Sequence, residues 1–93
     1  MKLTFSSVPM PEREQRELLW QAMFPQSADR ADDLDLGVLA EGFIMSGGYI
    51  KNSVLRAAYF AADEGVSISQ RHLLRAARSE YEAIGKITFA QPL

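Results

Sequence analysis

The residues able to do acid–base or nucleophilic chemistry are few in this sequence. It contains a single histidine, His72, and no cysteine. Nucleophilic catalysis needs a Ser, Cys or Thr held beside a base that is itself oriented by a third group, and no such set can be assembled here. We expect His72 to be solvated in the first turn of a helix. The sequence therefore predicts no catalytic residue.

Two patterns that bind phosphate or metal ions are incomplete. A phosphate loop needs a glycine, four further residues and then Gly-Lys-Ser or Gly-Lys-Thr. The Gly-Lys pair at 85–86 is followed by isoleucine, and Glu80 occupies the position that should be glycine. Four aspartates gather in one polar stretch: Asp29, Asp32, Asp33 and Asp35. They lack the glycine and the closing glutamate of a calcium loop, so we expect a solvated loop and a helix cap, with no metal site.

Two adjacent glycines stand where a helix is expected to begin. The stretch 45–53, MSGGYIKNS, runs directly into VLRAAYFAADEG, which has the composition of a helix. A glycine inside a helix costs about 1 kcal/mol relative to alanine, and somewhat less near an end. Because a small domain has only a few kilocalories per mole of net stability, Gly47 and Gly48 require a reason beyond helix formation.

Length and composition indicate one globular domain. The chain has 93 residues, of which 47% are hydrophobic and 24% charged, and this is enough for one compact core. The formal net charge is −2, which gives no electrostatic footprint for nucleic acid. No apolar run approaches the roughly 20 residues that cross a bilayer, and the N-terminus is a poor signal peptide. We expect a cytoplasmic location.

Helical periodicity predicts four helices with short connections. The first begins near Pro11 and ends before Pro25, because proline is tolerated in a first turn and stops a helix later on. Capping residues mark the starts of the other three: Asp35, Ser46 and Ser69. Gly65 should end the third helix in a left-handed conformation, and Gly85 should end the fourth.

Apolar residues at helical spacing predict how these helices pack. Three pairs stand at the positions of a hydrophobic staple: Leu34 with Leu39, Met45 with Ile50, and Ile68 with Leu73. Buried stripes are expected at Leu18, Leu19, Ala22 and Met23, at Leu36, Leu39, Ala40 and Phe43, and at Leu73, Leu74, Ala77, Tyr81 and Ile84. The third helix carries Ala57, Ala58, Ala61 and Ala62, so it should be the central one. A solvated face of the fourth helix should hold Arg75, Arg78 and Glu80.

Together these features predict an all-α fold, a small four-helix bundle. Before it stands KLTFSSV, residues 2–8, which has the alternation of a short strand. A strand without a partner cannot satisfy its backbone groups, so we expect these residues to be a stub.

Three segments, in one order, carry a resemblance to a known family. FSSVPMPEREQRELLWQAMFP is similar to a last core strand followed by a Pro-x-x-x-x-Arg helix. LDLGVLAEGFIMSGGYIKNSVLRAAYFAA is similar to Leu-Ala, then Ser-Gly-Gly-x-Ile-(Lys/Arg)-Asn and an alanine-rich helix. ISQRHLLRAARSEYEAIGK is similar to a closing helix with Ala-Ala-Arg-x-Glu-Tyr. Over residues 5–86 the chain resembles the C-terminal helical lid of a bacterial AAA+ ATPase.

The resemblance implies a domain organisation. Residues 1–10 would be the remnant of a core strand and its linker, 11–86 the lid, and 87–93 a tail. The phosphate loop, the Mg²⁺ motif and the arginine finger belong to a core domain that would precede Met1. The full-length protein would then be an ATPase that uses ATP or ADP with Mg²⁺, whereas this chain alone would be no enzyme and hold no cofactor. The implied partners are the AAA+ core domain and a ring-shaped homo-oligomer, a hexamer, with no nucleic acid and no membrane.

The resemblance also implies site residues. In this family the N-terminal end of the lid's third helix faces the nucleotide. Ser46, Gly47 and Gly48 would therefore let backbone approach the ligand, since glycine has no Cβ and free N–H groups at a helix start favour an anion. Lys51 falls at the place of a sensor 2 cation, where relatives often have arginine. Contacts to another domain or subunit are implied for Arg16, Trp20, Asn52 and Arg78.

Other interpretations remain open from the sequence alone. Gly47 and Gly48 can serve a tight turn between two helices, Lys51 can be solvated, and Trp20 can be a core residue. The chain can instead be a stand-alone interaction module that holds a partner helix in an apolar groove. A third possibility is a helix-turn-helix-like DNA-binding domain, with Lys51 and Arg56 as the cations of its recognition helix.

Overall fold

The computed structural model describes residues 10–24 and 30–90, with side chains as far as residue 85. Four α-helices lie in these ranges: α1 (Arg13–Met23), α2 (Leu36–Gly42), α3 (Gly47–Glu64) and α4 (Gln70–Ala90). The described ranges contain no strand, and an isolated β-bridge joins Arg30 to Ile68. The expected all-α architecture of four helices is confirmed. The expected strand stub at 2–8 lies outside the described residues.

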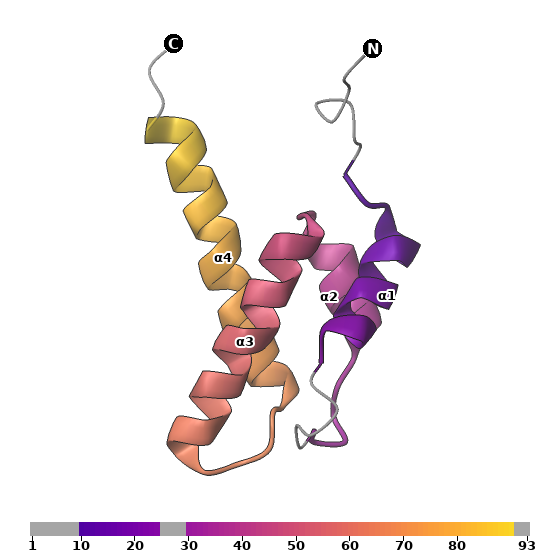
Figure 1. Ribbon diagram of the computed structural model, residues 1–93, viewed down its shortest axis with the longest axis vertical. Helices are drawn as coiled ribbons and strands as arrows, with labels where there is room; N and C mark the ends of the chain where they lie inside the picture. Colours follow the sequence, from indigo (N-terminus) through magenta and orange to yellow (C-terminus); the bar gives the residue numbers. More distant parts are fainter. Residues whose placement is uncertain (1–9, 25–29, 91–93) are drawn as a thin grey trace.

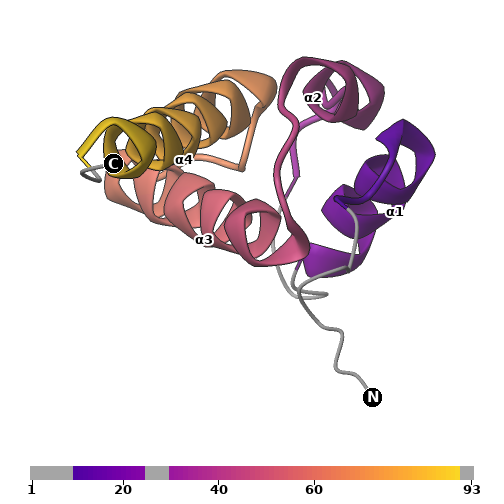
Figure 2. The ribbon, with the colours of Figure 1, turned by 90° about the horizontal axis from the view of Figure 1, so that it is seen from above.

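The helices form two pairs (Figures 1 and 2). In one pair α3 lies along α4, and in the other α1 lies beside α2. α3 contacts both α4 and α1, whereas α2 makes only a small contact with α4. The alanine-rich α3 is therefore the element that joins the two pairs, as its composition predicts.

The ends of α1 follow from local chemistry. The N–H of Glu12 donates to the Gln15 side chain at 2.9 Å, and the N–H of Arg16 reaches the Glu12 carbonyl at 2.8 Å. Phe24 follows the helix with φ −69° and ψ 131°, the extended conformation into which a following proline forces a residue. The predicted start near Pro11 and end before the next proline are confirmed.

The starts of α2 and α3 differ in their capping. Asp35 caps α2, since its side chain accepts from the N–H of Val38 at 3.2 Å. Ser46 takes the N-cap position of α3, but its hydroxyl makes no capping hydrogen bond. The first N–H groups of α3 therefore donate no hydrogen bond to the N-cap side chain, which is their usual acceptor.

Of the two glycines predicted to end a helix, one does so and the other does not. Gly65 has φ 72°, and its N–H and that of Val66 turn back to the carbonyls of Ala62 and Ala61 at 3.1 and 3.0 Å, which is a Schellman ending. Gly85 does not end α4, and that prediction is wrong. Its φ is not positive and α4 continues to Ala90, because a glycine stops a helix only when it leaves the helical conformation.

One apolar cluster fills the interior between the two pairs. It contains Trp20, Leu39, Met45, Ile50, Val54, Leu73 and Ala77, each with no exposed surface. Leu34, the outer member of the first predicted staple, is partly buried against it. Ala57 and Ala61 of α3 and Ala76 of α4 are buried as well, and such small side chains let two helices approach closely.

The predicted inner face of α1 is only half right. Leu19 and Met23 are partly buried against the core, but Leu18 is 63% exposed and Ala22 is exposed, and the fully buried positions on this helix are Arg16 and Trp20. Leu18 and Ala22 are therefore left on the surface. A periodic pattern shows that a face is apolar but does not tell which partner covers it.

Three predictions for α4 are also wrong. Tyr81 is 44% exposed, with its ring edge-on to Phe43 at 5.8 Å between centroids, because the short α2 covers little of α4. Glu80 is 6% exposed and pairs with Arg56 of α3 at 2.9 Å, since α4 packs along the length of α3. His72 is 1% exposed and belongs to a polar network at the start of α4.

Candidate functional site

The N-terminal end of α3 lies between two surface hollows. The first is a groove of about 950 Å³ against α1, lined by Met10, Pro11, Gln15, Leu18, Leu19, Ala22, Ser46 and Gly47. The second is a shallower hollow over α3 itself, lined by Ser46, Gly48, Tyr49, Lys51, Asn52 and Leu55. A groove of this size, mostly apolar with a few polar groups at its edge, has the character of a small-molecule site.

Among the described residues, nothing requires either glycine of the pair. Both lie in α3 with φ values that are not positive. A Cβ at Gly47 would meet the two methyl groups of Leu19 at 3.7 Å, an ordinary contact, and a Cβ at Gly48 would meet only the Ser46 hydroxyl at 4.0 Å. Alanine fits at both positions and is the better helix former. A tight turn therefore does not explain this glycine pair.

Backbone donors are exposed at the same place. No hydrogen bond among the described residues uses the N–H groups of Gly47, Gly48 and Tyr49, and Gly48 is exposed. Three free N–H groups and the positive end of an 18-residue helix favour an anion that can come close. Residues without a Cβ make that approach possible.

Lys51 adds a cation to the second hollow. Its side chain is exposed and forms no ion pair with any described residue. It stands in the first turn of α3, close in sequence to the free N–H groups. Asn52, exposed beside it, also bonds to no described residue. Both side chains are available to a ligand or to another surface.

The other residues implied to contact a domain or subunit divide into two kinds. Arg78 is exposed on α4. Arg16 is 7% exposed, and its guanidinium donates at 2.8 Å to the carbonyls of Ala40 and Pro11. Trp20 is fully buried, with its indole Nε1 unbonded to any described residue. The structure therefore gives Arg16 and Trp20 roles inside the domain, with Trp20 in the core.

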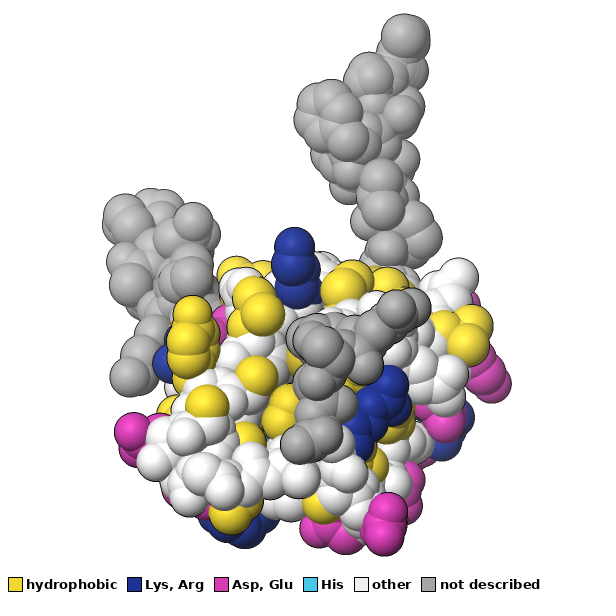
Figure 3. All heavy atoms as spheres, turned by 60° about the horizontal axis from the view of Figure 1, so that its bottom comes forward, with side chains coloured by type: hydrophobic (Ala, Val, Ile, Leu, Met, Phe, Trp, Pro, Cys, Tyr) yellow, Lys and Arg dark blue, Asp and Glu magenta, His cyan; other side chains and the backbone are white. Residues whose placement is uncertain are grey.

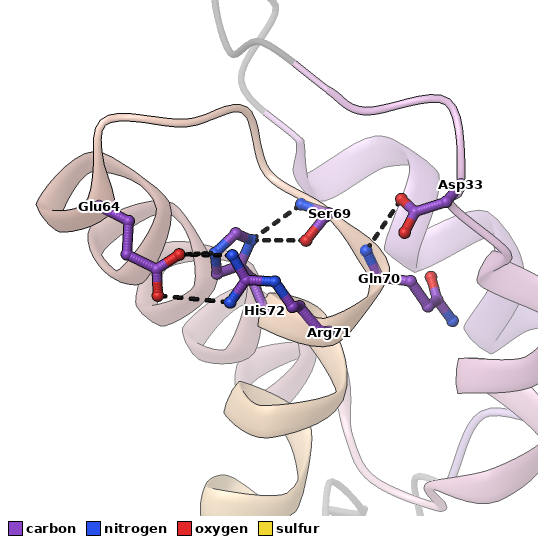
Figure 4. A network of polar contacts seen from close by, with 6 residues as sticks. All are labelled: Asp33, Glu64, Ser69, Gln70, Arg71 and His72. Atoms are coloured by element: carbon purple, nitrogen blue, oxygen red, sulfur yellow. Dashed lines mark hydrogen bonds and ion pairs between the residues drawn. The ribbon is translucent and has the colours of Figure 1, made fainter.

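A polar network that the sequence analysis missed lies at the other end of α3 (Figure 4). His72 Nε2 is 3.0 Å from Glu64 Oε1, and its Nδ1 is 3.0 Å from the N–H and 2.9 Å from the hydroxyl of Ser69. Arg71 also binds the Glu64 carboxylate, at 2.6 Å. The spacing Ser-x-x-His, which matches the Ser-x-x-Glu of a capping box, is the signal that could have revealed it.

The electrostatics of this network centre on Glu64. Hydrogen bonds from Arg71 and then from His72 lower the pKa of Glu64 from its ordinary value of 4.5 to about 2. Glu64 therefore stays ionised at neutral pH. The same contact with Glu64 raises the pKa of Arg71 above its ordinary value. The network holds a fixed negative charge beside a fixed positive charge.

The trio of serine, histidine and glutamate does not form a nucleophilic site. A catalytic serine gives its proton to a histidine nitrogen that is free to accept it. Here Nδ1 already accepts the backbone N–H of the same serine, Ser69. The arrangement closes a helix cap and holds no activated nucleophile.

The described residues form neither a metal-binding cluster nor a membrane-spanning helix. Among the described residues no group of three or more His, Cys, Asp or Glu side chains is placed to hold a metal ion. None of the four helices in the described ranges has the length and apolar content needed to cross a bilayer.

Comparison with known proteins gives no match, either to a protein-family model or to a curated protein. The function must therefore be argued from the residues and the geometry above.

Proposed function

We propose that this chain is the C-terminal lid of an AAA+ ATPase, the class that its sequence resembles. In the intact protein a core domain would bind ATP or ADP with Mg²⁺, and the N-terminal end of α3 would face the nucleotide. The observation that carries the proposal is the glycine pair. Gly47 and Gly48 have room for a Cβ among the described residues, so their lack of a side chain is best explained by a ligand or domain outside these residues that approaches the helix end.

The exposed stripe of α1 supports the same proposal. Leu18, Leu19 and Ala22 line the groove beside Gly47, and Leu18 is 63% exposed. An apolar groove next to an anion-binding helix end suits a nucleoside whose phosphates point toward the N–H groups and Lys51. Part of the groove would be covered by the core domain.

The mechanism would be hinge closure. Contacts at the helix end that differ between ATP and ADP would favour different lid orientations, and the lid would pass the rotation to its neighbours in a ring-shaped hexamer. Such a protein would work in the bacterial cytoplasm. Arg78 and Asn52 remain the exposed candidates for contact with a neighbouring subunit or with the core.

The test uses the full-length ATPase and this chain in parallel. We expect Gly48→Ala and Gly47→Ala to weaken ATP binding by the full-length protein about tenfold or more, because a methyl group would displace the ligand from the N–H groups. In the isolated chain the same changes should leave the melting temperature unchanged or raise it. The readouts are a nucleotide titration, steady-state ATPase rates and thermal unfolding.

Gly85→Ala is the matched control. It also replaces a helical glycine whose Cβ would meet nothing within 4 Å, but it lies on α4, away from the site. It should stabilise the chain and leave ATP binding unchanged. Lys51→Ala should reduce the nucleotide response without affecting folding. If the Gly48→Ala protein binds and hydrolyses ATP like the parent, the nucleotide-facing assignment is wrong.

The exposed groove also favours the second candidate function, a module that holds a partner helix. An amphipathic helix could cover Leu18 and Met10, which is 53% exposed. This candidate does not explain why the helix end beside the groove lacks side chains. The DNA-binding alternative is weakened because Arg56 is paired with Glu80, and on the face in Figure 3 basic and acidic side chains are interspersed.

A further inference from the structure

His72 occupies the position of the acidic residue in a capping box. Ser69 is the N-cap of α4, since its carbonyl accepts the N–H of Leu73 at 3.2 Å. His72 stands three residues later, and its Nδ1 accepts the Ser69 N–H at 3.0 Å. In the usual box a Glu or Gln carries out this task. Here the acceptor is an imidazole nitrogen, which can be lost by protonation.

The neighbours of the ring specify its protonation state. A backbone N–H can only donate, so Nδ1 must carry a lone pair toward Ser69. Glu64 is ionised, with a pKa of about 2, and can only accept, so Nε2 must carry the proton. The geometry therefore assigns His72 as a neutral ring with its proton on Nε2.

We propose that His72 makes the junction between α3 and α4 sensitive to protons. A second proton, added at Nδ1, removes the lone pair that accepts the Ser69 N–H. The N–H of the ring and the backbone N–H of Ser69 then face each other as two donors. The Ser69 hydroxyl can turn to accept from the new N–H, but the backbone N–H still loses its partner. The start of α4 then loses its cap, and the network that joins it to Glu64 must rearrange.

The charges around the ring determine the direction of the effect. Glu64 of α3 attracts an imidazolium, but Arg71 of α4 already binds that carboxylate at 2.6 Å, so two cations would compete for one anion. Asp33, on the connection before α2, acts on Arg71 and accepts the N–H of Gln70 at 3.1 Å. The ring itself is 1% exposed.

A consequence for stability follows. The cap contributes fully while Nδ1 of His72 keeps its lone pair, and it is lost when that nitrogen gains a proton. Glu64 stays ionised well below neutral pH, because its pKa of about 2 means that its contribution is lost only at much lower pH. This device lies at the end of α3 opposite Gly47 (Figure 1) and does not depend on the proposed nucleotide site.

The experiment compares the 93-residue chain with its His72→Gln variant by thermal unfolding between pH 8 and about pH 5.5. Glutamine at this position can accept the Ser69 N–H at every pH. We expect the melting temperature of the parent, measured relative to that of the variant, to fall by about 4 °C on acidification. A difference that stays constant, or that shifts in favour of the parent, would overturn the proposal.

A second measurement needs no variant. Nitrogen-15 NMR of the parent should show at pH 8 a ring with its proton on Nε2 and a lone pair on Nδ1. The Ser69 amide proton should shift together with the ring signal as the pH falls. Two results would contradict the assignment even if His72→Gln failed to fold. One is a proton on Nδ1 at pH 8, and the other is a Ser69 amide shift that does not change together with the ring signal.

Discussion

Arg16 is the side chain that holds the chain entering α1 against α2. Its guanidinium is buried and donates at 2.8 Å to two carbonyls, those of Ala40 and Pro11. Hydrogen bonds from a charged donor contribute about 1.5–3 kcal/mol, and a buried carbonyl left without a donor loses its solvation as well. At the scale of single residues, this is the contact whose loss should matter most.

Arg16→Met tests this role, because it keeps the apolar stem and removes the donors. We expect the free energy of unfolding to fall by about 2–4 kcal/mol. Arg13→Met is the control, since Arg13 is 42% exposed and pairs with Glu17 at 2.9 Å and with Glu41 at 3.1 Å, and such exposed pairs contribute much less than buried hydrogen bonds. Urea unfolding at unchanged m-value measures both, and equal losses would contradict the assignment.

At the scale of elements, hydrogen bonds between two connecting segments tie the helix pairs together, among them the bond from the Gln70 N–H to Asp33 at 3.1 Å. Gln70, at the start of α4, uses its side-chain amide to pair with the backbone of Asp35. It accepts the Asp35 N–H at 2.9 Å and donates to the Asp35 carbonyl at 3.0 Å. Nearby, the N–H of Ala31 reaches the carbonyl of Ile68 at 2.8 Å. These bonds connect the segment before α2 with the segment before α4, where the helices themselves make little contact.

Gln70→Ala should therefore loosen the two pairs at this end without unfolding α4. We expect amide hydrogen exchange at Asp35 to become about tenfold faster, while exchange in the middle of α3 stays unchanged. Gln21→Ala, at an exposed position of α1, should leave both rates as they are. Unaltered exchange at Asp35 in the Gln70→Ala chain would show that the connection is held by other contacts.

At the scale of the whole molecule, the proposed function implies that this chain provides one half of a nucleotide site and that the core domain provides the other half. It offers an apolar groove, free N–H groups and Lys51, but its sequence has no phosphate loop. If the chain is a lid, we expect it to move as one body, since α3 contacts both α1 and α4. Rotation of the lid would then carry the helix end and the groove together.

A titration of the isolated chain with ATP and Mg²⁺ tests whether this chain holds only part of the nucleotide site. Because most of the phosphate contacts would lie in the core domain, we expect a dissociation constant weaker than about 1 mM, equivalent to less than about 4 kcal/mol of binding, and no hydrolysis. Micromolar binding by the isolated chain would show that the site is complete here and would remove the need for a core domain.

Much of the fold could be predicted from local rules. The cap at Asp35, the N-cap position of Ser46, the Schellman ending at Gly65 and the extended residue after α1 each depend on a few neighbouring residues. The glycine pair was recognisable as unusual for the same reason, since its cost is local. The sequence could therefore single out the residues of the candidate site, whereas the groove and the free N–H groups beside them are seen only in the structure.

Only the tertiary structure decided which faces turn inward. The predicted stripe of α1 has the same apolar spacing whether its partner is within this chain or beyond it, and only Leu19 and Met23 pack against the core, while Leu18 and Ala22 lie on the surface. Glu80 and His72 look solvated in the sequence, yet Arg56 and Glu64 of α3 provide the partners that allow their burial. Spacing along a helix is determined by the chain itself, whereas burial depends on residues that packing brings from elsewhere in the sequence.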